Sequence, residues 1–334
     1  QRVLVVGANL RKDHPLFALR VRHAVRHGAQ LNVITDPAAF SHADAWAMPV
    51  ANAVVTDAFA WAQTLADLAV AIAAEKGVAA PCAGTASASA QAMAKSLLGG
   101  ERKALLLGNA AAHHGNASTL LALANWIGAQ TGASVGYLTE AANTVGAQWV
   151  GAQPQTGGKH AGQMLAGGLK AAVLLNTEPE FDSAAGAAAA KALGQAEMVV
   201  TLSPFKANMA FSDVLLPIAP FTETSGSFVN AEGRLQSFHA VVKPLAETRP
   251  AWKVLRVLAN LLEIPGVAFE TSQDVLARAT AQPLAASNAT RSAINLTGTT
   301  TPAPAVASIY QLDGIVRRAP SLQLTADARQ EVTP

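Results

Sequence analysis

The sequence predicts an α/β protein with two doubly wound domains and an irregular C-terminal tail. First, short apolar runs recur and end in glycine or a polar turn, as at residues 3–6 and 103–107. Second, helical apolar periodicity follows each run, which is the pattern of buried parallel strands connected by helices. Third, Ser, Thr, Ala and Pro dominate residues 271–304, a linker-like composition. We therefore divide the 334 residues into 1–100, 101–265 and 266–334.

The first domain begins with a strand–helix–strand unit. Residues 3–6 predict a strand that ends at Gly7, and residues 31–34 predict the next strand. Backbone amides of the loop at Gly7 could hold a phosphate at a helix N-terminus. The full G-x-G-x-x-G fingerprint is absent, so an ordinary turn is the favoured alternative.

The segment between these strands predicts an amphipathic helix that ends near Gly28. Arginines occupy its wetter side, and its apolar stripe consists of Leu16, Leu19, Val21, Ala24 and Val25. Residues 57–77 and 79–100 predict two further helical segments, and we place the domain boundary near Gly99 and Gly100.

The second domain repeats the strand-to-glycine pattern at residues 103–107, which lead into Gly108. Residues 171–175 and 198–202 predict further strands, and residues 252–262 predict an amphipathic helix. The loop after Gly108 contains the adjacent His113 and His114, which invite a metal hypothesis. Sequence neighbours do not share a helix face, so hydrogen-bonded loop histidines are the favoured interpretation.

A polar segment at residues 221–236 follows the apolar run 213–217 and is punctuated by Gly226 and Gly233. This order predicts a loop at the carboxyl edge of a strand. Ligands bind at that edge in open α/β sheets. A surface loop held by its own hydrogen bonds is the alternative.

Composition excludes several functions. The net charge of +2 gives no electrostatic case for nucleic acid, and basic residues do not form a stripe with interleaved aromatics. The single cysteine, Cys82, excludes an internal disulfide and argues against a cysteine-ligated zinc or iron–sulfur centre. Residues 58–74, the most apolar stretch, are interrupted by polar residues and predict a buried helix instead of a membrane span.

Several motifs resemble one family in the same order. Residues 213–217, followed by Glu223, Gly226 and the run 230–236, are similar to the signature of the molybdopterin oxidoreductase superfamily. Within it, residues 309–323 most resemble the C-terminal segment of the large iron–sulfur subunit of bacterial respiratory complex I. The resemblance implies Rossmann-like three-layer domains of the formate dehydrogenase/DMSO reductase type, corresponding to domains 1–3 of those enzymes.

The resemblance also implies where a pterin dinucleotide would lie in related enzymes. Leu10 stands where the family's first loop has proline, and Ala38 stands where a later loop has arginine. Losing that arginine removes a bidentate phosphate partner. We therefore expect no molybdopterin, no catalytic residue, no metal ligand and only a vestigial cleft. Its candidate residues are Gly7, Asn9, Asp36, Gly108, Asn143, Glu223, Gly226, Asn230 and Arg234.

By the same resemblance, the whole subunit would pass electrons from NADH toward quinone through iron–sulfur clusters. Their cysteines are expected in a region preceding Gln1, and these residues would be a structural scaffold. We expect partners among the other hydrophilic-arm subunits of complex I, on the cytoplasmic side of the bacterial inner membrane, without nucleic acid and without direct membrane insertion.

Two alternatives remain open. One is a fragment of an active molybdopterin-dependent oxidoreductase such as a formate dehydrogenase, in which the same cleft residues would line a pterin site. The other is a thiamine- or nucleotide-binding Rossmann module. The latter explains the strands that end in glycine but not the spacing from Glu223 to Gln236.

Overall fold

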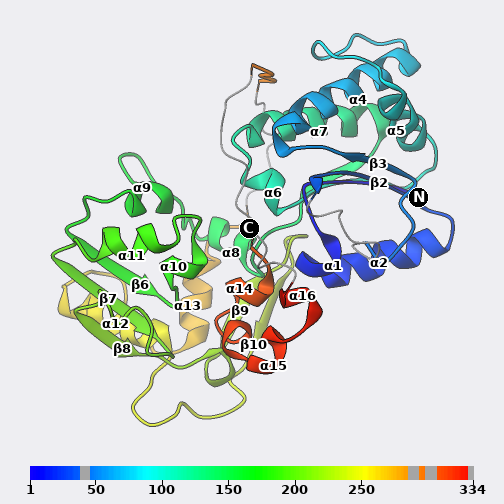
Figure 1. The fold of residues 1–334 in the computed structure, drawn as a ribbon. Helices are drawn as coiled ribbons and strands as arrows, with labels where there is room; N and C mark the ends of the chain where they lie inside the picture. The colour runs from blue at the N-terminus through cyan, green and yellow to red at the C-terminus, as the bar shows by residue number, and fades with distance from the viewer. Residues whose placement is uncertain (38–45, 285–292, 298–306, 330–334) are drawn as a thin grey trace. The chain divides into compact units, whose positions relative to one another are not determined.

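A computed structural model describes residues 1–37, 46–284, 293–297 and 307–329 (Figure 1). The chain forms two compact units, one of residues 1–140 with 286–334 and one of residues 141–285. Each unit contains a parallel sheet and helices, so the predicted α/β class is confirmed. No helix among the described residues is long and apolar enough to span a membrane.

The first unit contains one five-stranded parallel sheet with the order β3-β2-β1-β4-β5. Its strands are β1 (Arg2–Val6), β2 (Gln30–Thr35), β3 (Asn52–Val55), β4 (Lys103–Leu107) and β5 (Ser134–Tyr137). Its helices are α1 (Leu10–Asp13), α2 (Pro15–Arg26), η1 (Ala58–Ala60), α4 (Trp61–Lys76), α5 (Ala88–Leu98), α6 (Asn109–Ala112), α7 (Ala117–Thr131), α14 (Ile309–Leu312), η3 (Val316–Arg318), α15 (Pro320–Gln323) and α16 (Ala326–Arg329).

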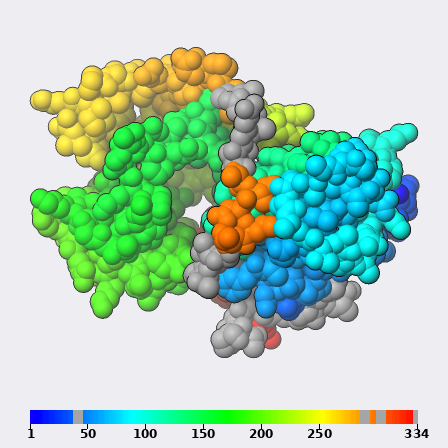
Figure 2. Space-filling view, turned by 90° about the horizontal axis from the view of Figure 1, so that it is seen from above, coloured from blue at the N-terminus to red at the C-terminus, as the bar shows by residue number. Residues whose placement is uncertain are grey.

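Helices cover both faces of this sheet. Successive side chains of a strand point to opposite faces, so β1 contributes to a core cluster on each face. Leu4 and Val6 of β1 pack in one cluster with α4, α5 and α7. Val3 and Val5 pack in a second cluster with α2. The described segment 293–297, orange in Figure 2, also lies against this unit, and its Ile294 and Leu296 pack on the first cluster.

The domain boundary differs from the predicted one near Gly99 and Gly100. β4 pairs with β1 in parallel, with Leu107 opposite Val6, so residues 103–140 belong to the first unit. The repeated strand-to-glycine pattern was the basis for a second domain. A doubly wound sheet produces the same repeat within one domain, because each half contributes its own strand-to-loop turn.

The outward side of α2 also differs from the prediction. Leu16 and Leu19 are 76% and 60% exposed, whereas Ala18 and Val21 are buried. The buried side is therefore narrow and lined by small residues, rotated away from the two leucines. The predicted positions of Val21, Ala24 and Val25 agree with the structure, since all three are at least partly buried.

The second unit contains a three-stranded parallel sheet with the order β6-β7-β8 and an antiparallel hairpin of β9 and β10. Its strands are β6 (Ala171–Leu175), β7 (Met198–Ser203), β8 (Val214–Pro217), β9 (Gly226–Val229) and β10 (Leu235–Phe238). Its helices are α8 (Thr144–Trp149), α9 (Ala161–Leu165), α10 (Pro179–Asp182), α11 (Ala187–Leu193), η2 (Phe221–Glu223), α12 (Ala251–Leu261) and α13 (Ser272–Ala279).

The two faces of the three-stranded sheet differ in exposure. Val199 and Thr201 on one face are buried. On the opposite face Val173 and Met198 are 55% and 51% exposed, and the register places Val214 on the same side. Parallel sheets are normally covered on both faces. Leu202 on this same face is buried, so only part of the face is an uncovered apolar surface.

The tail contains more helix than predicted. Residues 272–279 form α13 within the second unit, where Thr271 and Asp274 make a reciprocal capping box. Ser308 caps the first of the short helices that follow in the first unit. These caps fix local turns that composition alone did not indicate. The linker predicted at residues 299–304 and the substitution at Ala38 lie outside the described residues.

Candidate functional site

Gly7 and Gly108 end two neighbouring strands at the carboxyl edge of the first sheet. Gly7 has φ +61°, and a Cβ there would lie 2.6 Å from the Trp61 ring and 2.8 Å from the Ala111 nitrogen. A Cβ on Gly108 would lie 2.1 Å from the Ala8 Cβ. Both glycines therefore allow the loops after β1 and β4 to pack against each other.

Asn9 and Asp36 are the other two candidates in this unit. The Asn9 Oδ1 accepts the Lys12 amide at 3.3 Å and caps α1, and the Asn9 amide donates to Asp13 Oδ2 at 3.0 Å. Asp36 follows the end of β2 and is half-buried. The structure thus places all four first-unit candidates at one sheet edge, where Asn9 maintains the loop itself.

Three further polar groups at this edge were not predicted as site residues. Thr35 Oγ1, His14 Nε2 and Asn109 Oδ1 are buried atoms without a hydrogen-bond partner among the described residues. Thr35 ends β2 and Asn109 follows Gly108, so a polar residue at the end of an apolar run was the available signal. Burial lowers the pKa of His14, and the neighbouring Asn109 side chain partly offsets this effect. Such atoms normally bind water or a ligand.

The adjacent histidines are both hydrogen-bonded, as the loop interpretation predicted. His113 Nε2 lies 2.6 Å from Glu140 Oε2, and this contact raises the pKa of His113 and lowers the pKa of Glu140. His114 Nδ1 accepts the Asn116 amide at 2.9 Å, so its Nε2–H donates to the Ala58 carbonyl at 2.9 Å. No cluster of three or more His, Cys, Asp or Glu suited to a metal occurs among the described residues.

In the second unit, the predicted loop at residues 221–236 is largely the hairpin of β9 and β10. Asn230 builds the turn of the hairpin, because its Oδ1 accepts the amides of Glu232 and Arg234 at 3.0 and 2.9 Å. Gly233 has φ +81° within the same turn. The polar residues thus close a hairpin, and the Arg234 side chain is exposed.

The remaining signature residues also bind backbone. Glu223 Oε2 accepts the Leu245 amide at 2.9 Å, and Asn143 Oδ1 accepts the Val229 amide at 2.8 Å. A Cβ on Gly226 would lie 2.6 Å from the Phe238 ring. The alternative stated for this segment, a surface loop held by its own hydrogen bonds, therefore describes these contacts better than an open ligand loop.

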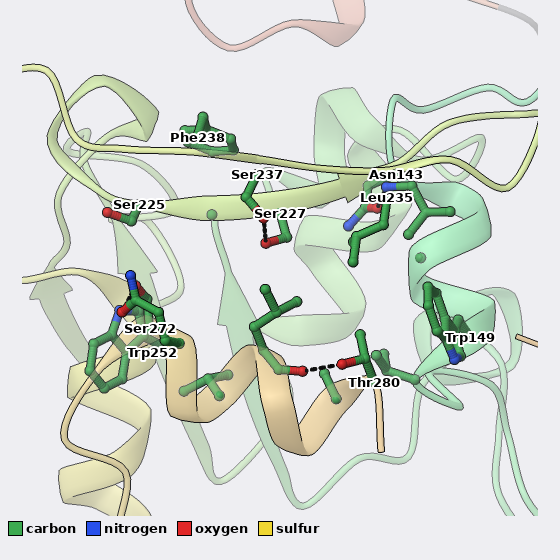
Figure 3. A pocket seen from close by; sticks show the side chains of 18 of the residues that line it. Asn143, Trp149, Ser225, Ser227, Leu235, Ser237, Phe238, Trp252, Ser272 and Thr280 are labelled. Atoms are coloured by element: carbon green, nitrogen blue, oxygen red, sulfur yellow. Dashed lines mark hydrogen bonds between the residues drawn. The ribbon is translucent and has the colours of Figure 1, made fainter. Parts of the chain in front are cut away.

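A pocket of about 260 Å³ lies beneath this hairpin, and Asn143 and Gly226 line it (Figure 3). Trp149, Trp252 and Phe238 provide aromatic walls, while several serines add hydroxyl groups. No Asp, Glu, Lys or Arg side chain lines the pocket. Glu223, Asn230 and Arg234 lie outside its lining. Among the described residues, His239 is the one titratable side chain in this mainly apolar lining, so the pocket has no cluster of basic groups that could neutralise the phosphates of a dinucleotide.

Comparison with known proteins shows which family this sequence matches. Residues 1–261 match the molybdopterin oxidoreductase family. The chain belongs to the molybdopterin oxidoreductase family. A putative formate dehydrogenase of Staphylococcus aureus is 44% identical over 52 residues, which cover 16% of this chain and 5% of that protein. A probable oxidoreductase of Bacillus subtilis is 38% identical over 69 residues, covering 21% and 7%.

A second kind of relative matches equally well. The mitochondrial NADH-ubiquinone oxidoreductase 78 kDa subunit of Candida albicans is 43% identical over 53 residues, covering 16% of this chain and 7% of that subunit. The matched segments thus represent only 5% to 7% of the length of these three relatives. The comparisons therefore establish an oxidoreductase family whose relatives include both formate dehydrogenase-like proteins and this NADH-ubiquinone oxidoreductase subunit.

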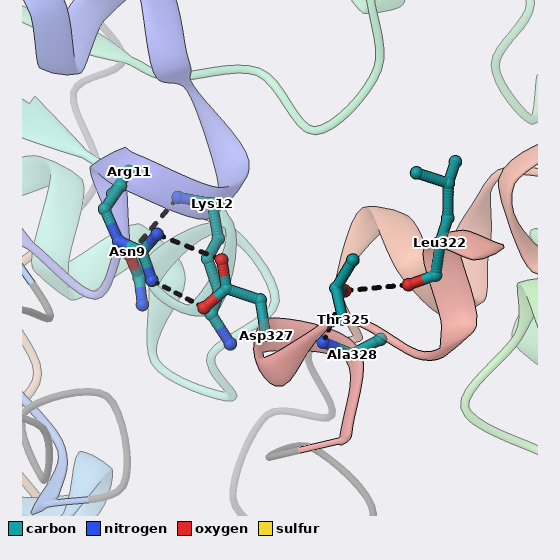
Figure 4. Close-up of polar contacts among 7 residues, drawn as sticks. All are labelled: Asn9, Arg11, Lys12, Leu322, Thr325, Asp327 and Ala328. Atoms are coloured by element: carbon teal, nitrogen blue, oxygen red, sulfur yellow. Dashed lines mark hydrogen bonds and ion pairs between the residues drawn. The ribbon is translucent and has the colours of Figure 1, made fainter.

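The family's name implies a pterin cofactor, so the fit of the first-unit loop decides what these residues can hold. The Gly7 amide donates to the Ile34 carbonyl at 3.0 Å, and the Asn9 amide is used by Asp13. The Arg11 guanidinium is paired with both oxygens of Asp327 at 3.0 and 2.8 Å (Figure 4). These groups do not form a cradle for the phosphates of a dinucleotide, because their donors are already engaged within the chain.

Proposed function

We propose that these residues are the molybdopterin-enzyme-like scaffold region of the iron–sulfur subunit of a proton-pumping NADH:quinone oxidoreductase. The whole complex transfers electrons from NADH to quinone, and this region contributes packing surface instead of chemistry. In this proposal its units are Rossmann-like domains of the formate dehydrogenase/DMSO reductase type. Its partners are other hydrophilic-arm subunits, on the cytoplasmic side of a bacterial inner membrane.

One observation carries this proposal: the family signature is used to hold the chain's own backbone. Asn143, Glu223 and Asn230 each accept backbone amides. A hydrogen-bond acceptor that already binds the chain contributes to its shape and has less capacity for a ligand. The signature therefore supports a retained fold with a vestigial pterin cleft.

Two further findings support the scaffold role. The complex I subunit of Candida albicans shares 43% identity over 53 residues with this chain. The exposed apolar side chains Val173 and Met198 give the second unit a surface suited to packing against a partner subunit. The iron–sulfur clusters of such a subunit would be bound by cysteines outside these residues, since Cys82 is the single cysteine here.

The test is metal and pterin analysis of the full-length protein after gentle purification. Inductively coupled plasma mass spectrometry should find iron but neither molybdenum nor tungsten, and oxidative pterin extraction should give no fluorescence. One molybdenum or tungsten atom per polypeptide, together with a pterin, would overturn the proposal.

The second candidate is an active molybdopterin-dependent oxidoreductase. It is favoured by the buried Thr35, His14 and Asn109 atoms that lack a partner at the sheet edge. Similarity to a putative formate dehydrogenase of Staphylococcus aureus also favours it. Formate-dependent reduction of a viologen dye by the molybdenum-containing protein would support this candidate. The proposed scaffold is expected to show no such reduction.

A further inference from the structure

The outer face of α2 is unusual because it combines positive charge with exposed leucine. The helix spans Pro15–Arg26 and buries Ala18 and Val21 on its inner side. The exposed side chains on the outer face are Leu16, Leu19, Arg20, Arg22, His23 and Arg26. These positions share one side of a helix with 3.6 residues per turn.

The positive charge on this face is not balanced locally. Arg20, Arg22 and Arg26 make no ion pair or side-chain hydrogen bond with the residues that the structure describes. The helix contains no acidic residue. Asp13 is the single acid in residues 1–35, and its Oδ2 accepts the Asn9 amide. An incoming anionic group would therefore meet three arginines without a competing carboxylate on α2 itself.

The leucines distinguish this face from an ordinary solvated charged surface. Leu16 and Leu19 are three residues apart, so their side chains are neighbours on the helix, and both are exposed. Exposed apolar groups with a charged border are typical of interaction surfaces. An arginine border also suits a partner that carries carboxylates, because guanidinium binds carboxylate through two parallel hydrogen bonds.

We propose that the outer face of α2 docks an acidic protein surface. Carboxylates of the partner would pair with Arg20, Arg22 and Arg26 and surround a shallow apolar area that receives Leu16 and Leu19. The buried side of α2, with Ala18 and Val21, packs inside the first unit, so it cannot enter a membrane as interfacial helices do. A nucleic acid would set the two leucines against its phosphates, which are poor partners for apolar groups.

This inference deepens the proposed scaffold function by naming one contact face and the chemistry of its partner. The two can fail separately. Metal and pterin analysis tests whether the region lacks a cofactor, whereas the binding experiment tests only α2.

The experiment measures binding of a fluorescein-labelled helical peptide of leucine and glutamate to the full-length protein by fluorescence anisotropy. A peptide with glutamine at every glutamate position is the matched probe. The wild-type protein should bind the glutamate peptide more tightly, and its affinity should fall as salt rises. The R20Q/R22Q/R26Q variant should bind it about tenfold more weakly, because three surface charge pairs are lost.

A control variant, K95Q/R102Q/K191Q, removes the same number of exposed positive charges elsewhere. It should remain within about twofold of the wild type, because these charges do not belong to the α2 face and salt screens exposed charges. A Leu16→Ser/Leu19→Ser variant should bind both peptides more weakly without changing the salt dependence. Melting curves monitor folding, and if the triple variant unfolds, the single substitutions R20Q, R22Q and R26Q should each show part of the loss.

Three outcomes would overturn the inference. The triple variant could bind the glutamate peptide as well as the wild type does, or the control variant could lose as much affinity. The wild-type protein could also bind vesicles of phosphatidylcholine and phosphatidylserine, or a DNA duplex, more tightly than the glutamate peptide at the same salt concentration.

Discussion

The strand-end loops of the first unit and the hairpin of the second unit use their signature residues in different ways. In the first unit, Gly7 and Gly108 are needed because two loops pass too closely for a side chain. In the second unit, Asn143 and Asn230 are needed because their side-chain oxygens hold backbone amides. Close packing thus dominates at the strand ends of the first unit and hydrogen bonds dominate at the hairpin of the second, although Asn9 caps α1 through a hydrogen bond and Gly226 packs closely on Phe238.

This difference teaches how a ligand-binding fold can retain its motifs without using them for a ligand. Close backbone approach and turn formation are requirements of the chain itself. They persist whether or not a cofactor lies nearby. A motif residue is evidence for a binding site only when its polar atoms remain available, as they do for Thr35 and Asn109 and do not for Asn230.

The largest effect should come from Gly108→Ala in the first unit. Its Cβ would lie 2.1 Å from the Ala8 Cβ and 2.5 Å from the Gly7 carbonyl oxygen, and backbone must move to relieve the overlap. We expect a loss of about 3 kcal/mol or more in the free energy of unfolding, measured by urea denaturation.

Two glycines serve as controls for this substitution. Gly226→Ala meets only the ring of Phe238, which can rotate away, so its effect should be smaller. Gly28→Ala has open space around its Cβ and tests the strain of a positive φ alone. If the Gly108→Ala variant has the same urea midpoint of unfolding as the wild type, close packing of the two loops does not explain the need for glycine.

Next in size is Asn143→Ala in the second unit. The substitution leaves the partly buried Val229 amide without its acceptor, which should cost about 2 kcal/mol. Asn143→Asp retains an acceptor oxygen and should preserve most of the stability. Faster hydrogen exchange of the Val229 amide in the alanine variant provides the local measurement. Unchanged exchange in the alanine variant would argue against this hydrogen bond.

Prediction from the sequence worked where the determining pattern was local. Strand runs such as residues 3–6 and the helix predicted at 252–262 depend on neighbouring side chains, and both are found. The boundary near Gly99 and the exposure of Leu16 depended on which strands pair and on how a helix rotates against a sheet. Neither strand pairing nor helix rotation can be read from the spacing of apolar residues within one segment.

For the candidate site, the sequence located the sheet-edge residues but not their roles. The hairpin turn had a recognisable signal, since Asn230 and Gly233 are the residue types that tight turns favour. That Thr35 Oγ1 and Asn109 Oδ1 would be buried without a hydrogen-bond partner was only weakly indicated by the sequence. Whether a polar atom has a hydrogen-bond partner depends on side chains that are distant in sequence.

A smaller effect is expected for Asn230→Ala in the exposed hairpin turn. Its Oδ1 accepts two amides that water can also reach, so the loss should be about 1 kcal/mol. Asn230→Asp keeps both acceptor contacts and is the matched variant. Circular dichroism melting should rank the alanine variant below the aspartate variant. The opposite order would show that the turn depends on backbone conformation and not on this acceptor.

The smallest effect concerns the His113–Glu140 pair of the first unit. The hydrogen bond raises the pKa of His113, so its contribution is fully present below the unfolded value of about 6.5 and is lost as pH rises through the folded pKa. The same contact lowers the pKa of Glu140, whose contribution is present above about pH 4.3 and is lost as pH falls through its folded pKa.

Both groups are roughly half-exposed, so we expect the pair to contribute only about a few tenths of a kcal/mol to the free energy of unfolding. His113→Gln should therefore differ most from the wild type in melting temperature near pH 5.5, between those two values, and the difference should shrink toward pH 9. A difference in melting temperature that does not depend on pH would show that the two side chains contribute by packing and not by charge.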